Sequence, residues 1–409
     1  MEEILATKAG RPGTAAVPAV PGPPAVPGPP GPAGPAHRPA RWVRTRLRAS
    51  PAAALLTAAL ALVTVFLAVA APRLADRGAD AALRDYVRQK GIHATSLHFT
   101  SRTAPADTAA GLDAVDRELV ARVGARTALA PERLAHGART ESDVMLNPGY
   151  RRVSHDIPPR LSLIVLHGLA DRVTLTEGSW PGPATAGAPV PMMVSRAAAE
   201  LIGLKVGDVV DNGTDGSGGS RSTVVTGLYR PNDPLDPFWV GIGCPDRPCL
   251  ALGAEHGNWH EVTGFVDGGS LTALTTWSRS VQNFWRVSVD PAPLRADRLA
   301  RARADVLPFL SGPGADALAA ATGRADLRAV STLPVILEWA AERHRAATAL
   351  SAIGPVGVAG VAAVVLCLAA ALGTDRRAAE LRLLRARGCS RGGVALRLLG
   401  EGAVTVLPA

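Results

Sequence analysis

The sequence predicts a membrane protein in which transmembrane α-helices flank a large extracytoplasmic α+β domain. Three observations predict this fold class: two long uncharged apolar stretches, a long electrically neutral segment between them, and basic residues concentrated beyond their outer ends. Because cytoplasmic flanks of membrane helices are enriched in Lys and Arg, both outer ends are expected in the cytoplasm. Residues 73–345 are then expected outside the cell.

Residues 1–50 form an N-terminal tail that is dominated by Pro, Gly and Ala. Glycine does not recur at every third position, so a collagen helix is excluded. The composition predicts a disordered cytoplasmic tail rich in polyproline II conformation. A partner of the SH3 class would fit such a tail.

Residues 51–72 are the first predicted transmembrane helix. The stretch from Pro51 to Ala71 is uncharged and follows several arginines, and it has the roughly 20 residues that a helix needs to cross a hydrocarbon core. A cleaved signal peptide also has a basic start, but its apolar core is shorter and lies closer to the N-terminus. An uncleaved membrane helix is therefore preferred.

Residues 73–345 are predicted to form the outer domain, with helical stalks at both ends, near 74–89 and 333–345. Residues 112–135 predict a further helix, and β-branched and aliphatic runs from Arg160 predict strands. Ser195 is a candidate N-cap for a short helix. The segment after that helix predicts two strands joined by a Gly/Ser-rich hairpin loop.

Residues 346–373 are the second predicted transmembrane helix, with several glycines of the kind that let membrane helices pack closely. Residues 374–400 are predicted to be a cytoplasmic coupling loop. A third apolar stretch, 401–409, is predicted to start a truncated third transmembrane helix. We therefore expect the chain to be the N-terminal portion of a longer protein.

The distribution of charge separates the possible partners. The net charge is +9, but residues 73–345 contain equal numbers of acidic and basic side chains, so the excess lies in 1–50 and 374–409. A nucleic-acid-binding protein carries its positive charge on its folded domain, so nucleic acid is excluded as a partner. The lipid bilayer is expected instead, with a multi-pass plasma-membrane localisation and a cytoplasmic N-terminus.

Cys244 and Cys249 are the two cysteines of the predicted outer domain. In an oxidising compartment, this close spacing predicts a disulfide that closes a small loop. A zinc site that adds His256 and His260 is the alternative, but the spacing matches no common zinc module. The disulfide is preferred, and no metal site is predicted.

The chain shows no catalytic motif. A Walker A loop is absent from the sequence, so no nucleotide site of that type is expected. One G-x-S-x-G match, residues 388–392, follows a helical pattern rather than the strand that a nucleophile elbow requires. No catalytic residue and no cofactor are predicted, and the chain is expected not to be an enzyme.

The segment 376–400 contains apolar residues at helical spacing with arginines between them. It predicts a short amphipathic helix, a turn at residues 387–390 and a second helix. One interpretation is an interfacial helix held on anionic lipid by arginine. The other is a coupling helix that docks into a groove of a partner protein.

This segment resembles the loop that follows the second transmembrane helix of FtsX-like permeases, the membrane subunits of MacB-type ABC transporters. The positions that match the family pattern are Glu380, Leu383, Leu384, Arg385, Ala386, Gly388 and Ser390, with Arg376 and Arg377 slightly upstream. Looser similarity covers residues 173–183 and 194–210, and residues 225–239 resemble permeases of actinobacterial type.

The resemblance implies an ABC transporter permease with a MacB-like periplasmic core, driven by a separate cytoplasmic ATPase through export or mechanotransmission. It also implies a homodimer or a second permease half as partner. The implied ATPase-coupling residues are Arg376, Arg377, Glu380, Leu381, Leu384, Arg385, Arg387 and Gly388. The alternative is a membrane-anchored extracytoplasmic sensor or binding protein that has no ATPase partner.

Overall fold

A computed structural model describes residues 51–140, 144–145, 157, 159–214, 220–252, 257–278, 280–351, 378–388 and 390–406, with isolated residues between 357 and 375. Contacts divide the chain into two units. The larger unit is 63–372, and the smaller combines 1–62 with 373–409. The predicted disordered tail, 1–50, lies outside the described residues.

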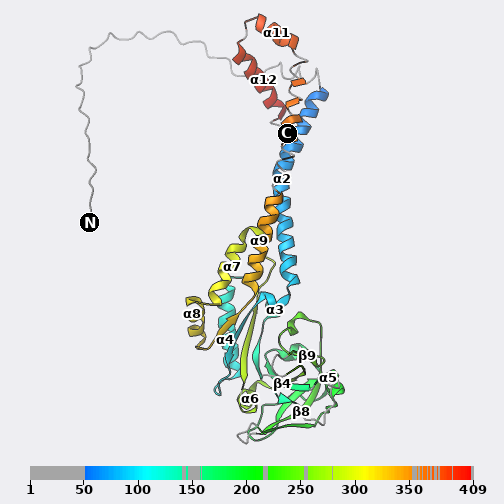
Figure 1. The fold of residues 1–409 in the computed structure, drawn as a ribbon, viewed down its shortest axis with the longest axis vertical. Helices are drawn as coiled ribbons and strands as arrows, with labels where there is room; N and C mark the ends of the chain where they lie inside the picture. The colour runs from blue at the N-terminus through cyan, green and yellow to red at the C-terminus, as the bar shows by residue number, and fades with distance from the viewer. Residues whose placement is uncertain are drawn as a thin grey trace, which may run out of the picture. The chain divides into compact units, whose positions relative to one another are not determined.

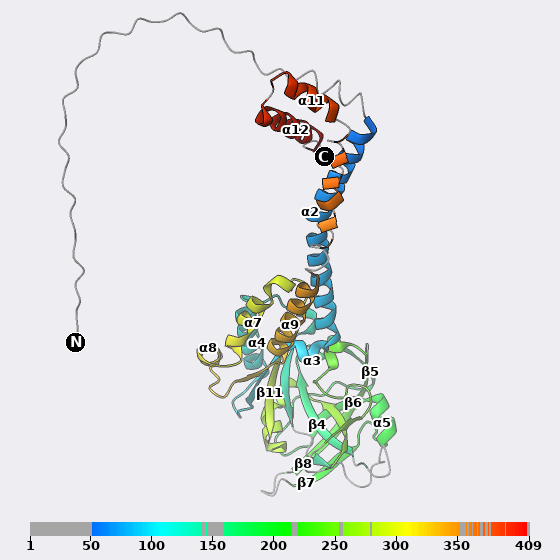
Figure 2. The ribbon, with the colours of Figure 1, turned by 45° about the horizontal axis from the view of Figure 1, so that its top comes forward.

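The larger unit is built on one mixed sheet (Figure 1), which has 12 strands in the described part of the chain, nine of them in the order β12-β1-β11-β2-β4-β10-β6-β8-β5. The strands are β1 Ser96–Arg102, β2 Ala135–Thr140, β3 Val144–Met145, β4 Pro159–Leu166, β5 Val173–Gly178, β6 Val190–Ser195, β7 Val209–Thr214, β8 Ser220–Pro231, β9 Cys249–Ala251, β10 Trp259–Phe265, β11 Val281–Ser288 and β12 Arg328–Val330. The pairs β4–β10 and β6–β8 are parallel. β7 lies along β8 (Figure 2).

The central strand β4 is buried on both faces. Leu161, Leu163 and Val165 belong to the larger hydrophobic cluster, while the alternate residues Ile164 and Leu166 belong to the smaller one. Because successive side chains of a strand point to opposite faces, the two clusters are the two sides of the sheet. Both faces are therefore covered.

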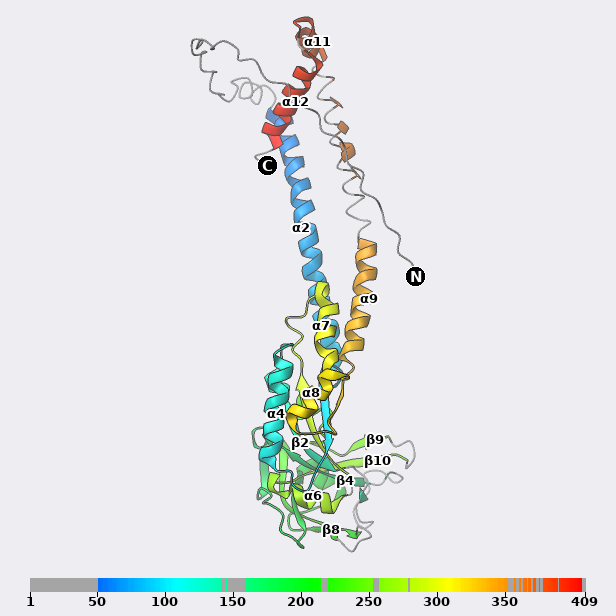
Figure 3. The ribbon, with the colours of Figure 1, turned by 90° about the vertical axis from the view of Figure 1, so that its left-hand side faces the viewer.

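The larger hydrophobic cluster takes residues from helices that pack on the sheet and on one another. In the described part of this unit, the helices with defined bounds are α3 Gly91–Thr95, α4 Ala109–Gly124, α5 Arg196–Ile202, α6 Leu271–Trp277, α7 Leu299–Val306, α8 Pro313–Thr322 and α9 Leu333–Ser351, together with the second half of α2 Pro51–Gln89. Leu112 and Leu119 of α4 are buried in this cluster. α7 lies beside α9 (Figure 3).

The smaller hydrophobic cluster lies under a loop that contains the short 3-10 helix η3, Pro237–Trp239. Phe238 and Trp239 of this helix are buried with Tyr229 and Phe265. Asp236 caps η3 by accepting a hydrogen bond from the Phe238 amide at 2.8 Å. The side chain of Trp239 also donates to the Asp233 carbonyl at 3.0 Å. A hydrogen bond within the loop therefore helps to hold this aromatic side chain over the sheet.

Two helices are connected along the chain to neighbouring strands of the sheet. α2 is followed by α3 and β1, whereas β12 is followed by α9. β1 and β12 pair antiparallel, with Phe99 opposite Ala329. α2 also contacts α9 through Tyr86, whose ring lies 4.8 Å from the Arg343 guanidinium. The two stalk helices predicted from the sequence are thus attached to adjacent strands.

The predicted transmembrane helices are not supported. No helix in the described part of the chain is long and apolar enough to cross a membrane. α2 covers the first predicted span, 51–72, but continues into a charged half that begins at Arg73. Most of the second span, 346–373, lies outside the described residues, and α9 is described up to Ser351. α12 Arg391–Val406, which reaches into 401–409, has 16 residues.

This finding overturns the predicted fold class, a membrane protein with transmembrane helices around an extracytoplasmic domain, and the predicted multi-pass plasma-membrane localisation. A membrane span needs a long, continuously apolar helix, and the described part of the chain contains no helix that qualifies. An apolar stretch in the sequence shows only that the segment avoids water. It does not show which helix will contain the segment or where that helix will end.

Several local predictions match the observed elements. Ser195 caps α5, with its hydroxyl accepting from the Ala198 amide at 3.0 Å. β7 and β8 form the expected strand pair after α5. The helix predicted over 112–135 is shorter, because α4 ends at Gly124 and Pro131 opens a 3-10 turn before β2. Proline is tolerated in the first turn of a helix but not in its interior.

Candidate functional site

The predicted coupling segment forms two helices, α11 Ala378–Ala386 and α12 Arg391–Val406, which contact each other. The turn between them contains Gly388, whose φ of 86° lies in the left-handed region. Ser390 caps the second helix, with its hydroxyl accepting from the Gly393 amide at 3.2 Å. Helix, turn and helix therefore occur at the residues where the sequence predicts them.

The predicted ATPase-coupling residues fall into three groups. Leu381 and Arg385 lie one helical turn apart on α11, with Leu381 half-buried and Arg385 exposed, and Arg387 and Gly388 form the exposed turn. Glu380 and Leu384 also lie on α11, but their side chains are outside the described set. Arg376 and Arg377 lie outside the described residues.

Replacing Gly388 by alanine should destabilise the turn between α11 and α12 by about 1 kcal/mol, because side chains with a Cβ rarely adopt a left-handed φ. A Cβ at this position would meet nothing within 4 Å, so the cost is conformational. Amide hydrogen exchange of residues 378–388 and 390–406 in the full chain should accelerate roughly fivefold.

Gly392→Ala is the matched control, because Gly392 lies inside α12, its φ is not left-handed, and a Cβ there also meets nothing within 4 Å. In the first turn of α12, alanine is at least as favourable as glycine, so exchange should not accelerate in this variant. Equal acceleration in both variants would show that the left-handed turn is not the cause.

Cys244 and Cys249 are joined by a disulfide, with their Cα atoms 5.7 Å apart. Cys244 is buried, and its amide donates to Thr263 of β10 at 2.9 Å. Cys249 begins β9, which pairs with β10. The two thiols are therefore not available as zinc ligands. His260 lies in β10, whereas His256 lies outside the described residues.

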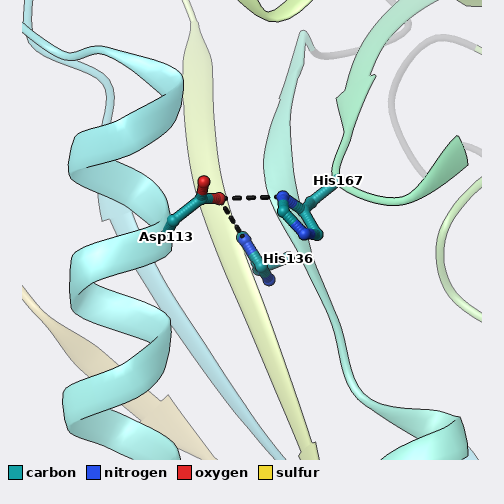
Figure 4. A group of neighbouring side chains, drawn as sticks. All are labelled: Asp113, His136 and His167. Carbon is teal, nitrogen blue, oxygen red and sulfur yellow. Dashed lines mark hydrogen bonds and ion pairs between the residues drawn. The ribbon is translucent and has the colours of Figure 1, made fainter.

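A second polar cluster was not predicted from the sequence. Asp113 lies on α4, His136 on β2, and His167 immediately after β4 (Figure 4). One oxygen of the Asp113 carboxylate lies 2.8 Å from Nε2 of His136 and 2.9 Å from Nδ1 of His167. The three side chains offer ligand atoms that all lie within 4.8 Å of one another.

A fourth side chain, Asp116, completes this cluster from the same helix. Its carboxylate oxygen lies 3.3 Å from Nδ1 of His136, on the opposite edge of the ring from Asp113. Asp113 and Asp116 are three residues apart and therefore lie on one face of α4. The imidazole of His136 is thus held between two carboxylates.

The carboxylates of the cluster and the imidazole of His136 stabilise each other's charged forms. Burial alone would lower the pKa of His136, but the carboxylates of Asp116 and Asp113 outweigh it and raise that pKa above its usual value. Burial would likewise raise the pKa of Asp113, but its hydrogen bond with His136 and the nearby charge of His167 lower it. With a proton on His136, the cluster is a network of ion pairs.

The pairing of β2 with β4 brings the two histidines together. Gly137 pairs with Leu166, and one step further the His167 amide donates to the His136 carbonyl at 3.1 Å. The rings stack with centroids 4.5 Å apart and 22° between their planes. Gly137 permits this approach, since a Cβ there would lie 1.9 Å from the Val165 carbonyl oxygen.

The sequence contained a weak indication of this cluster. In β4 the residues facing the larger cluster are Leu161, Leu163 and Val165, so the two-residue period places His167 on that face. In β2 the same two-residue period places His136 on the same face as Ala138, which belongs to the larger cluster. The shared face of the two histidines follows from this alternation, but the pairing of β2 with β4 does not.

Searches against models of known protein families and against curated proteins found no match. The resemblance of residues 376–390 to FtsX-like permeases therefore stays a prediction from the sequence.

Proposed function

We propose that this chain is an FtsX-like subunit that works by mechanotransmission, driven by a separate ABC-type ATPase that grips α11. The helix–turn–helix at residues 378–406 carries the proposal, because it lies where the sequence resembles the family's coupling loop. ATP hydrolysis belongs to the partner. This chain supplies α11, the helix that the ATPase binds, and the sheet domain that moves.

The exposed surface of α11 supports a docking role. Leu381 and Arg385 are four residues apart and so lie on one side of the helix. Leu383 presents an apolar side chain that is 63% exposed. Arg385 and Arg387, at the end of the helix, are exposed and complement the negative end of its dipole. A groove with apolar walls and acidic rims is the partner surface that this helix fits.

The attachment of α2 and α9 to the sheet supports transmission. The Asp80 carboxylate of α2 accepts from the Ala296 amide at 2.8 Å, and the Thr332 hydroxyl, just before α9, donates to the Ala94 carbonyl at 2.8 Å. Because β1 and β12 are neighbours, a displacement of either helix reaches the same edge of the sheet. The sheet domain is then displaced as a whole, since interiors of proteins are close-packed.

The test is affinity purification of the full chain from its native host, beside a Leu381→Asp/Arg385→Glu variant. The wild type should retain a partner that carries its own Walker A motif, identified by mass spectrometry. The variant should bind that partner about 30-fold more weakly, the effect of losing one interface hot spot of about 2 kcal/mol.

Leu396→Asp/Arg391→Glu is the matched control. It makes the same two changes on exposed residues of α12 and should leave the partner bound. If neither the wild type nor the control retains an ATPase, the proposal fails, and a binding protein that works without an ATPase takes its place. Equal loss in both double variants would place the contact outside α11.

A further inference from the structure

We propose that Asp113, His136 and His167 bind a divalent transition-metal ion of the Zn²⁺ class. This inference is independent of the proposed coupling to an ATPase, because the cluster lies between α4 and the sheet and involves no residue of α11 or α12. It rests on the kind of ligand atoms, their spacing, the support of His136 by Asp116, and access from solvent.

The ligand atoms suit such an ion. Two imidazole nitrogens and one carboxylate oxygen form the protein ligand set of many zinc sites that keep an open position. At Zn–ligand distances of 2.0–2.2 Å, tetrahedral ligand atoms lie about 3.3 Å apart. The two contacts of Asp113, 2.8 Å and 2.9 Å, are within about half an ångström of that spacing, and the third pair, between the two imidazoles, lies within 4.8 Å.

Asp116 places a carboxylate beside the second ring nitrogen of His136, at ion-pair distance and without a hydrogen bond. A ligating histidine usually donates its second ring N–H to a carboxylate or carbonyl, which orients the ring and selects the tautomer. Nδ1 of His136 faces Asp116 at 3.3 Å, while Nε2 faces Asp113 and the cluster. The buried ring is therefore turned with the correct nitrogen toward the ion.

The backbone holds the ligands in place before an ion binds. The hydrogen bond from the His167 amide to the His136 carbonyl and the stacking of the two rings fix the histidines relative to each other. Asp113 and Asp116 come from consecutive turns of one helix. Such pre-organisation lowers the entropic cost of binding.

The cluster is open to solvent on one side. The side chain of His167 is 58% exposed and that of Asp113 is 30% exposed, whereas that of His136 is 9% exposed. An ion can therefore enter past His167. Three protein ligands in a tetrahedral arrangement leave one position for water or for a group of a bound partner.

The test uses the full chain, treated with a chelator and then titrated with Zn²⁺ by calorimetry. One Zn²⁺ should bind per chain. Co²⁺ in place of Zn²⁺ should give visible d–d absorption with the same stoichiometry, which reports on the ligand field at the ion. The melting temperature should rise with Zn²⁺, because an ion that binds only the folded state stabilises it.

Three variants test the assignment of residues. His167→Ala and Asp113→Asn should each weaken Zn²⁺ binding more than about 100-fold, and Asp116→Asn, which alters only the support of His136, should weaken it about 10- to 100-fold. His167 is the most informative position, because its exposed side chain can be removed without opening the core. A circular dichroism spectrum like that of the wild type shows that each variant is folded.

His93→Ala is the matched control. His93 is an exposed histidine whose ring packs against that of a second one, His98, with centroids 4.4 Å apart and 44° between the ring planes. Among the described residues, this pair does not belong to a group of three or more candidate metal ligands. Zn²⁺ binding should be unchanged in this variant. The proposal is overturned if the wild type binds no ion, or if folded His167→Ala binds Zn²⁺ as tightly as the wild type.

Discussion

Replacing Trp285 by alanine should lower the free energy of unfolding by about 3–5 kcal/mol. Trp285 lies in the middle of β11, is 1% exposed, and belongs to the larger hydrophobic cluster. Its indole N–H donates to the Leu112 carbonyl of α4 at 3.1 Å. The variant would therefore lose apolar burial, create a cavity between α4 and the sheet, and remove one buried hydrogen bond. Urea unfolding followed by far-UV circular dichroism measures the effect.

Trp180→Ala is the control for this variant. Trp180 lies in the loop after β5 and is 43% exposed. Exposed positions without buried contacts usually change stability by less than about 0.5 kcal/mol, so the unfolding midpoint should hardly move. Similar losses in the two variants would show that Trp285 is not part of a packed core.

Replacing Asp107 by asparagine should lower the free energy of unfolding at neutral pH by about 2–3 kcal/mol, because Arg324 loses its counter-charge in a largely buried site. Arg324 donates to the Asp107 carboxylate at 2.8 Å, and its side chain is 12% exposed. Asn283 of β11 donates to the same carboxylate at 2.8 Å. The pair connects the loop before α4 with the loop between α8 and β12.

The pH dependence of this pair has a definite sign. Burial alone would raise the pKa of Asp107, but the hydrogen bonds from Arg324, from the Ala104 amide and from Asn283 lower it below 3.8. A depressed pKa contributes stability above the unfolded-state value, and this contribution is lost as the pH falls toward the folded-state value. The stability difference between wild type and Asp107→Asn should therefore shrink below about pH 4.

Asp297→Asn provides the comparison with an exposed ion pair of the same chemistry. Asp297 contacts Arg295 at 3.1 Å, and more than half of both side chains is exposed. Exposed pairs of this kind often contribute nothing measurable, so this variant should unfold like the wild type at neutral pH. Urea unfolding of the three proteins across the acidic range measures both effects. A loss in Asp107→Asn that does not change with pH would contradict the electrostatic explanation.

The features predicted correctly from the sequence are local ones. The Ser195 cap, the strand pair β7–β8, and the turn between α11 and α12 each depend on a few adjacent residues. Their geometry follows from backbone conformation: a hydroxyl that satisfies a free helix N–H, or a glycine that accepts a left-handed φ. No distant part of the chain is needed to produce them.

The membrane prediction failed for a related reason. Hydropathy describes the composition of a window of residues, but it does not determine which helices the fold forms over that window. In the structure, α2 runs through the first predicted span and continues past Arg73 to Gln89. The concentration of basic residues in 1–50 and 374–409 had the same limitation as evidence for membrane helices. It describes the composition of the two ends of the chain and not the helices that lie between them.

The Asp113–His136–His167 cluster shows the limit most clearly. The chain alone places both histidines on one face of their strands through the two-residue period, and both aspartates on one face of α4 through the helical period. Only the pairing of β2 with β4 and the packing of α4 over them bring these faces together. Those contacts join residues far apart in the chain, and they form because burying the shared apolar face lowers the free energy of the whole fold.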